Sequence, residues 1–234
     1  MKYFLIAGEA SGDLHASQLI KSLRAADSQA EFAFLGGDMM AEAAGVAPIV
    51  HYKSMAYMGF VDVLLHLKSV LGNLSKAKSS LKALMPDALI LIDYPSFNLR
   101  IAKYAYGLNI PVYYYISPKV WAWKEHRVKD IRKYVRQVFS ILPFEVDFYR
   151  KHGMQIMYVG NPTLNEVDEK LSHIISEEDF RSKNDLSSEP ILALVPGSRI
   201  SEIKSNLPYM VKAAENLKGD RKSTRLNSSH PSRS

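Results

Sequence analysis

The sequence contains no cysteine and no apolar run long enough to cross a membrane as a helix. The absence of cysteine excludes disulfide bonds, thiolate metal sites and cysteine nucleophiles. A spanning helix needs about 18 or more largely uncharged apolar residues, and no window of the sequence meets that requirement. The first apolar run covers only residues 3–7, which is too short for the core of a secretory signal peptide.

A concentrated basic region is also missing from most of the chain. The net charge is +6, and half of it comes from the Ser/Arg-rich residues 220–234, which have no apolar periodicity. We expect this tail to be disordered and foreign to the natural protein. The rest of the chain is only mildly basic, so the composition does not favour a nucleic-acid partner.

Short apolar runs alternate with amphipathic stretches through the first two thirds of the chain. The apolar runs predict strands over residues 3–7, 31–35, 88–92, 111–116, 137–142 and 156–159. The stretches between them predict helices over 13–26, 38–44, 58–85 (broken near Gly72), 99–106, 124–134 and 145–152. Runs such as ALILI are typical of parallel strands buried on both faces. The alternation predicts an α/β fold, a doubly wound, Rossmann-like parallel sheet.

The pattern changes after Gly160-Asn161-Pro162. A polar helical stretch over 165–176 and a linker over 182–190 precede a predicted strand over 191–195 and a helix over 200–218. One strand and one helix cannot bury their own apolar faces. We therefore expect a first domain over 1–162, the start of a truncated second Rossmann-like domain over 163–219, and the tail over 220–234.

Polar and glycine-rich turns follow several predicted strands. AGEASGDLHA, residues 7–16, joins the first strand to the first helix, and either Ser11 or Asp13 can cap that helix. Ligands of doubly wound sheets bind outside the carboxyl ends of the strands. The turn is therefore either a plain capped corner or a binding loop. It is not GxGxxG, so a dinucleotide cofactor is not supported.

Two charged residues at such strand ends stand out. Asp93 terminates the apolar strand in ALILIDYPSFN, where a carboxylate is either a structural cap or a general base. Arg199 lies in the turn VPGSRISEI, where a guanidinium beside helix N–H groups can hold a diphosphate or can simply be exposed.

Two further segments each allow two interpretations. Trp121 and Trp123, the only tryptophans, lie in SPKVWAW. Either they form a sugar platform or a lid, or one of the two rings packs in the core. Residues 55–74 carry a wide apolar arc flanked by lysines. That arc is typical of a core helix or of a helix lying in a membrane interface.

Taken in order, these segments closely resemble the lipid-A-disaccharide synthase family, bacterial glycosyltransferases of lipid A biosynthesis. The resemblance covers nearly all of residues 2–218 and rests on AGEASGDLHA, FLGGDMM, MGFVDVL, PDALILIDYPSFN, YYISPKVWAWKEHRVKDI, ILPFEVDFY, YVGNP and LVPGSRISEI. It implies the glycosyltransferase type B architecture, two Rossmann-like domains with the active site between them, here with the second domain truncated. It implies no cofactor and no essential metal.

The resemblance also implies substrates and a location. The family transfers UDP-activated 2,3-diacylglucosamine to 2,3-diacylglucosamine 1-phosphate, which gives a β(1→6) disaccharide and UDP. It works in the cytoplasm as a peripheral protein at the inner face of the inner membrane. The truncation leads us to expect negligible turnover from this chain. The alternatives are another UDP-sugar enzyme of the same fold, such as an epimerase, and a lipid-binding fragment without catalysis.

Residue roles follow from the same resemblance. Asp93 matches the family's catalytic carboxylate, and Arg199 matches the arginine that offsets charge on the UDP leaving group. The implied substrate-binding residues are Ser11, Gly12, Asp13, Asn98, Ser198 and Glu202. The implied membrane and acyl-chain contacts are Val61, Leu64, Leu67 and Leu71.

Overall fold

The computed structural model describes residues 1–55, 67–197 and 200–218. The chain divides into two compact units, Met1–Glu166 and Val167–Ser234, called unit 1 and unit 2 below. Unit 1 holds a single parallel sheet with helices on both of its faces, and unit 2 is helical in its described part. The predicted α/β fold with a doubly wound parallel sheet is confirmed.

Seven strands form the sheet in the order β3-β2-β1-β4-β5-β6-β7, and every neighbouring pair is parallel. The strands are β1 (Lys2–Ala7), β2 (Glu31–Gly36), β3 (Val50–His51), β4 (Ala88–Ile92), β5 (Val112–Tyr115), β6 (Gln137–Ser140) and β7 (Met157–Tyr158). The order reverses between β1 and β4, which is the point where doubly wound sheets open a crevice for ligands.

Helices follow most strands in unit 1. They are α1 (Ala10–Ala26), α2 (Asp38–Ala44), α4 (Leu67–Leu84), α5 (Pro95–Gly107), α6 (Val128–Tyr134) and α7 (Phe144–Lys151), with short 3-10 helices η1 (Tyr52–Ser54) and η2 (Glu125–Arg127). α8 (Thr163–Ser172) runs across the boundary between the units, and α9 (Glu177–Lys183) and α10 (Ile200–Lys218) lie in unit 2.

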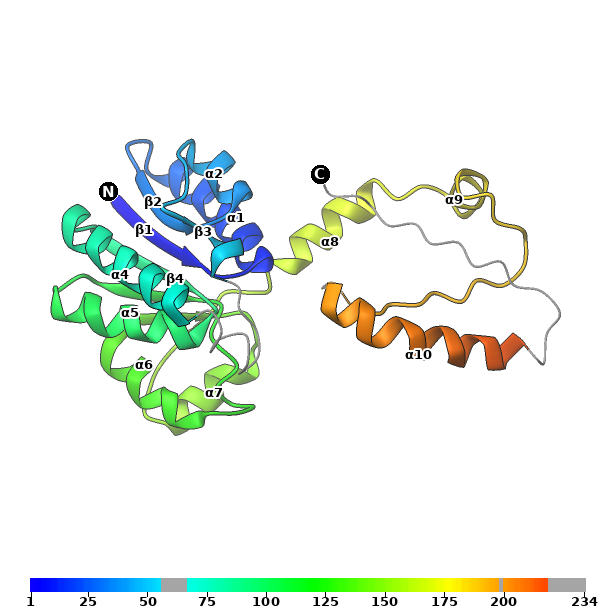
Figure 1. Ribbon diagram of the computed structural model, residues 1–234. Helices are drawn as coiled ribbons and strands as arrows, with labels where there is room; N and C mark the ends of the chain where they lie inside the picture. The colour runs from blue at the N-terminus through cyan, green and yellow to red at the C-terminus, as the bar shows by residue number, and fades with distance from the viewer. Residues whose placement is uncertain (56–66, 198–199, 219–234) are drawn as a thin grey trace. The chain divides into compact units, whose positions relative to one another are not determined.

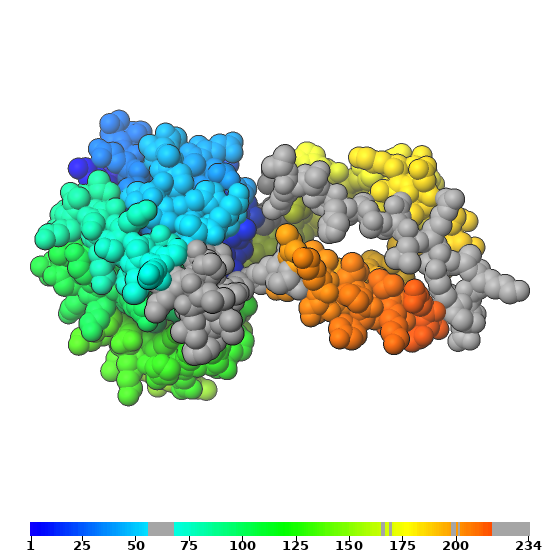
Figure 2. Space-filling model, in the orientation of Figure 1, coloured from blue at the N-terminus to red at the C-terminus, as the bar shows by residue number. Residues whose placement is uncertain are grey.

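The alternating side chains of the strands create two apolar cores, one on each face of the sheet. Phe4 and Ile6 of β1 pack with buried residues of α4, α5 and α6. Leu5 and Ala7 point to the other face, where α1 and α2 cover them. Figure 1 shows α1 and α2 on one side of β1, with α4 and α5 on the other side. In Figure 2 the side chains of unit 1, from blue to green, pack into one continuous body.

The main differences from the sequence-based predictions are these. The described part of the predicted helix 58–85 continues through Gly72 without a break, because Leu74, Ala77 and Leu81 keep packing against the sheet. The strand predicted at 191–195 is wrong: these residues form no strand, since the described part of unit 2 offers no neighbouring strand. The linker begins later than predicted because α9 precedes it, and β3 is too short for a sequence pattern to reveal.

Candidate functional site

The carboxyl ends of four adjacent strands meet at one edge of the sheet in unit 1. Ala7 pairs with Ile92, Ile92 with Tyr115, and Tyr115 with Phe139. The residues that follow these positions therefore emerge side by side. Among them are two carboxylates, Glu9 and Asp93, at the point where the strand order reverses. This edge is the candidate site.

Asp93 leaves β4 in an unusual backbone conformation. Both Asp93 (φ 41°) and Tyr94 (φ 46°) are left-handed, although neither is glycine. The amide of Asn98 donates to the carbonyl oxygens of Ile92 (3.2 Å) and Asp93 (2.8 Å), and the Tyr114 hydroxyl also donates to the Asp93 carbonyl. Because left-handed non-glycine residues cost energy, they persist only where surrounding contacts hold them, and they concentrate at functional sites.

The same surroundings change the acidity of Asp93. Burial raises the pKa of its carboxyl group, and the negative charge of Glu9 raises it further. The ammonium of Lys119 and the backbone N–H of Tyr94 act in the opposite direction on that pKa. A carboxylate whose pKa is raised toward, but not above, the working pH stays ionised and accepts a proton more readily, which suits a general base.

A further carboxylate at this edge is fully buried, and the sequence analysis missed it. Glu145 in the first turn of α7 is 1% exposed. Its Oε1 accepts a hydrogen bond from Trp121 Nε1 at 3.1 Å, and its Oε2 accepts one from the Ser140 hydroxyl. Burial raises the pKa of Glu145, while Lys119 lowers it and the charge of Asp93 raises it. The position of Glu145 in ILPFE, just after an apolar strand, is the signal that could have revealed it.

Both tryptophans lie at the surface, which excludes the interpretation that one ring packs in the core. Trp121 is 39% exposed and meets Phe144 edge to face, with ring centroids 5.0 Å apart. Trp123 is 60% exposed, and the Lys124 Nζ lies 4.3 Å from its ring centroid. Exposed rings beside the candidate site remain compatible with a sugar platform or a lid.

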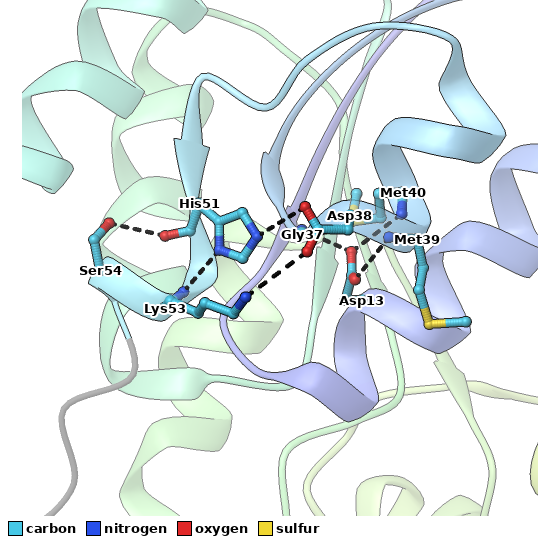
Figure 3. A network of polar contacts seen from close by, with 8 residues as sticks. All are labelled: Asp13, Gly37, Asp38, Met39, Met40, His51, Lys53 and Ser54. Atoms are coloured by element: carbon cyan, nitrogen blue, oxygen red, sulfur yellow. Dashed lines mark hydrogen bonds and ion pairs between the residues drawn. The ribbon is translucent and has the colours of Figure 1, made fainter. Parts of the chain in front are cut away.

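Asp13 belongs to the framework of the site. It lies inside α1, 3% exposed, and its carboxylate accepts hydrogen bonds from the backbone N–H groups of Gly37 (2.7 Å), Met39 (3.1 Å) and Met40 (3.2 Å). Figure 3 shows this carboxylate at the start of α2. Asp13 therefore caps α2 rather than α1, whose N-cap Glu9 makes no side-chain cap. The prediction that Ser11 or Asp13 caps α1 is wrong.

The remaining predicted residues fall into three groups. At the edge of unit 1, Ser11 is exposed, Gly12 is buried against Ala7, and Asn98 is fully buried beneath Asp93. Leu71 is 50% exposed on α4, which begins at Leu67, and Glu202 lies on α10 of unit 2. The others lie outside the described residues: Val61, Leu64, Ser198 and Arg199.

Neither a metal-binding cluster nor a membrane-spanning helix occurs in the part of the chain that the structure describes. Within the ranges that the structure describes, no three His, Asp or Glu side chains lie together as a metal site would require. None of the helices in those ranges combines the length and the apolar character that a membrane crossing needs.

Comparisons with known proteins agree with one another. A family model described as "Lipid-A-disaccharide synthetase" matches residues 3–232. Lipid-A-disaccharide synthase from Nitrosococcus oceani is 42% identical over 91% of this chain and 54% of its own length, and that from Myxococcus xanthus is 40% identical over 94% and 56%. The chain thus spans about half the length of the curated relatives it matches.

Among solved structures, the fold resembles UDP-GlcNAc 2-epimerases. The enzyme from Neisseria meningitidis gives a TM-score of 0.54 with 10% identity, over 78% of this chain and 52% of the other. The enzyme from Methanocaldococcus jannaschii gives a TM-score of 0.55 with 13% identity, over 99% of this chain and 66% of the other. At such low identity the likeness concerns the fold alone.

Proposed function

The chain belongs to the lipid-A-disaccharide synthetase family, and from this premise we propose that it supplies the acceptor side of a glycosyltransferase. The donor is UDP-activated 2,3-diacylglucosamine and the acceptor is 2,3-diacylglucosamine 1-phosphate. The product is a β(1→6)-linked disaccharide with release of UDP. The observation that carries the proposal is the carboxylate of Asp93, held by a strained turn at the edge where the sheet order reverses.

Asp93 acts as the general base in this proposal. It takes the proton of the acceptor's 6-hydroxyl while that oxygen attacks the anomeric carbon of the donor. The new carbon–oxygen bond forms as the bond to the UDP oxygen breaks, and its electron pair leaves with UDP. Attack from the face opposite UDP inverts the anomeric centre. Tyr114 and Asn98 support the step by fixing the backbone of Asp93.

The donor's diphosphate is assigned to the turn before α10. Arg199 and Ser198 would balance the charge that develops on UDP, with Glu202 on the following helix contacting the donor. On the acceptor side, Ser11 and Gly12 would line the site beside Asp93, while Asp13 holds the neighbouring α2 in place.

The acylated substrates require access to a membrane surface. We assign this access to the apolar arc that includes Val61, Leu64, Leu67 and Leu71, which would place the protein peripherally at the cytoplasmic face of the inner membrane. Changing these four residues to serine should lower binding of the chain to phospholipid vesicles in a sedimentation assay. Val46→Ser and Ile49→Ser, which alter exposed apolar residues elsewhere in unit 1, should leave binding unchanged. Unchanged binding of the fourfold variant would remove the membrane assignment.

The activity is best tested in a hybrid in which residues 1–166 replace the matching part of the Nitrosococcus oceani relative. We expect this hybrid to form the disaccharide and release UDP, and Asp93→Asn to reduce turnover by a factor on the order of 10² to 10⁴. Asp87→Asn is the matched control, because the exposed Asp87 side chain accepts from the backbone N–H of Lys2 at the opposite edge of the sheet. An Asp93→Asn hybrid as active as the parent would refute the assignment of the base. Vesicle binding without turnover by the parent hybrid would instead favour a lipid-binding role.

A further inference from the structure

Helix α7 contacts the loop that follows β5 at two points, one helical turn apart. Glu145 and Tyr149 occupy positions i and i+4 of α7 and are 1% and 0% exposed. Glu145 accepts a hydrogen bond from Trp121 Nε1 at 3.1 Å. The Tyr149 hydroxyl lies 2.8 Å from the hydroxyl of Ser117, which is itself 5% exposed. The two ends of the loop segment 117–121 are thus fixed to one face of one helix, and we call these two contacts the α7 clamp.

The clamp is anchored on the sheet as well as on the helix. The second carboxylate oxygen of Glu145 accepts from the hydroxyl of Ser140, the last residue of β6. Ser140 is fully buried, and its Oγ also accepts from the backbone N–H of Leu142 at 3.1 Å. Because a buried carboxylate with one oxygen on the sheet and one on the loop has little freedom, Glu145 ties the loop to the rigid edge of the sheet.

The loop needs such support because its backbone is strained where it leaves the sheet. Ile116 has φ 64°, a conformation that is unusual for a β-branched residue. The strained residues Ile116 and Asp93 are neighbours, because Tyr115 and Ile92, which precede them, are paired in register on adjacent strands. Strained turns on adjacent strands persist only when other contacts hold them.

The clamped segment carries one charged side chain, that of Lys119. Its ammonium acts on both Asp93 and Glu145, lowering the pKa of each carboxyl group. Glu9, which follows β1, opposes Lys119 by raising the pKa of Asp93, and the charges of Asp93 and Glu145 repel each other. Lys119 is the only positive charge among these groups, and its place depends on the two fixed ends of its loop.

We propose that Glu145 and Tyr149 are positioning residues, which hold the loop and its Lys119 beside the strained turn of Asp93. The role of Asp93 as a base rests on the proposed function, whereas the effect of the clamp on Asp93 can be measured without catalysis. Glu145 and Tyr149 act through the loop and contact neither substrate nor reacting atoms in this scheme.

The test is an NMR titration of the Asp93 carboxyl group in the purified chain. Trp121→Phe and Tyr149→Phe each remove one clamp contact without changing the charge of the protein. We expect both to raise the pKa of Asp93, because release of the loop removes Lys119 from its vicinity. Lys119→Met should raise that pKa at least as far. In the Lys119→Met background, neither clamp variant should shift the pKa of Asp93 any further.

Matched controls separate this role from general support of the fold. Tyr104→Phe removes a hydroxyl group on α5, and Lys124→Met removes an exposed ammonium that stacks on Trp123. Neither control should shift the Asp93 titration. If Tyr149→Phe fails to fold, Ser117→Ala removes the same contact from the loop side.

Two results would overturn the proposal. The first is a set of clamp variants that lower the melting temperature but leave the pKa of Asp93 unchanged. The second is a shift that persists in full after Lys119→Met, which would show that the clamp acts by another route. Failure of the proposed function is distinguishable from both, because it would appear as an Asp93→Asn hybrid that retains turnover while the titration behaves as expected.

Discussion

The two units of the chain place similar sequence patterns in different surroundings. The run KYFLIA forms β1, which pairs with a strand on each side, and its residues Phe4 to Ala7 are fully buried. The run ILALV in unit 2 is equally apolar but forms no strand, and Val195 is 79% exposed. The difference teaches that an apolar run becomes a strand only when neighbouring strands can accept its backbone hydrogen bonds.

The helices differ in the same way. α5 in unit 1 buries six residues, among them Ile101 and Ala102, between the sheet and its neighbours. α9 in unit 2 buries none, and its Phe180 is 45% exposed. Packing against a sheet therefore distinguishes unit 1 from unit 2 more than the local sequence does.

The largest expected effect compares two leucines. Leu89 in β4 is fully buried, whereas Leu192 in unit 2 is 53% exposed. Leu89→Ala should lower the free energy of unfolding by about 3 kcal/mol, because it opens a cavity in a packed core. Leu192→Ala should change it by less than about 0.5 kcal/mol. Urea denaturation followed by circular dichroism measures both, and equal losses would mean that unit 2 is packed as tightly as unit 1.

A second comparison concerns helix capping. Asp13 caps α2 from a different helix and satisfies three buried or half-buried N–H groups, while Ser176 caps α9 locally and is exposed. Asp13→Ala should cost about 2 kcal/mol, because it leaves amides unsatisfied in the interior. Ser176→Ala should cost about 0.5 kcal/mol or less. A Ser176→Ala chain destabilised as strongly as Asp13→Ala would contradict the difference between the units.

The sequence predicts the sheet of unit 1 well because its strands are buried on both faces. Continuous apolar runs revealed β1, β2, β4, β5 and β6 to within about two residues, and their ends located Asp93. The run at 191–195 gives the same signal without a sheet to join, so pattern alone could not separate the two cases.

The unpredicted parts of the site depend on contacts between distant residues. Glu145 meets Trp121 across 24 positions, and Asp13 meets Gly37 across 24 positions. Neither contact leaves a periodic signal in the sequence, because each is created when separate strands bring their following loops to one edge. The left-handed conformation of Asp93 has the same origin, since it is held by Tyr114 from the neighbouring strand.

Substituting alanine for two glycines of unit 1 tests how strongly local packing determines the free energy of unfolding. A Cβ added at Gly8 would lie 2.4 Å from the ring of Tyr94, whereas one added at Gly72 in α4 would meet nothing within 4 Å. Gly8→Ala should cost about 1–2 kcal/mol through overpacking against the ring. Gly72→Ala should stabilise the chain by up to about 1 kcal/mol through higher helix propensity. Thermal unfolding measures both signs, and a stabilising Gly8→Ala would show that Tyr94 is free to move.

The smallest expected effects concern two carboxylates of unit 1, Asp93 and Asp27, whose pKa values shift in opposite directions. Burial and the charge of Glu9 raise the pKa of Asp93, so the folded chain binds this proton more tightly than the unfolded chain does. Ionisation of Asp93 therefore removes stability as the pH rises from about 4, its ordinary value, through its folded pKa. Asp93→Asn cannot ionise, so its free energy of unfolding at pH 7 should exceed that of the parent. The gain should be smaller than the loss caused by Leu89→Ala. Below about pH 4 the two chains should be equally stable.

Asp27 should show the opposite dependence of stability on pH when its carboxylate is replaced by an amide. A hydrogen bond from the N-terminal ammonium lowers the pKa of Asp27, so its ionised form supports the fold above its ordinary pKa and that support is lost as the pH falls. Asp27→Asn should therefore be less stable than the parent at pH 7. Urea unfolding of the three chains at pH 7 and near pH 4 distinguishes these cases. A destabilised Asp93→Asn at pH 7 would mean that the surroundings of Asp93 stabilise its charged carboxylate, and that burial does not raise its pKa in the folded chain.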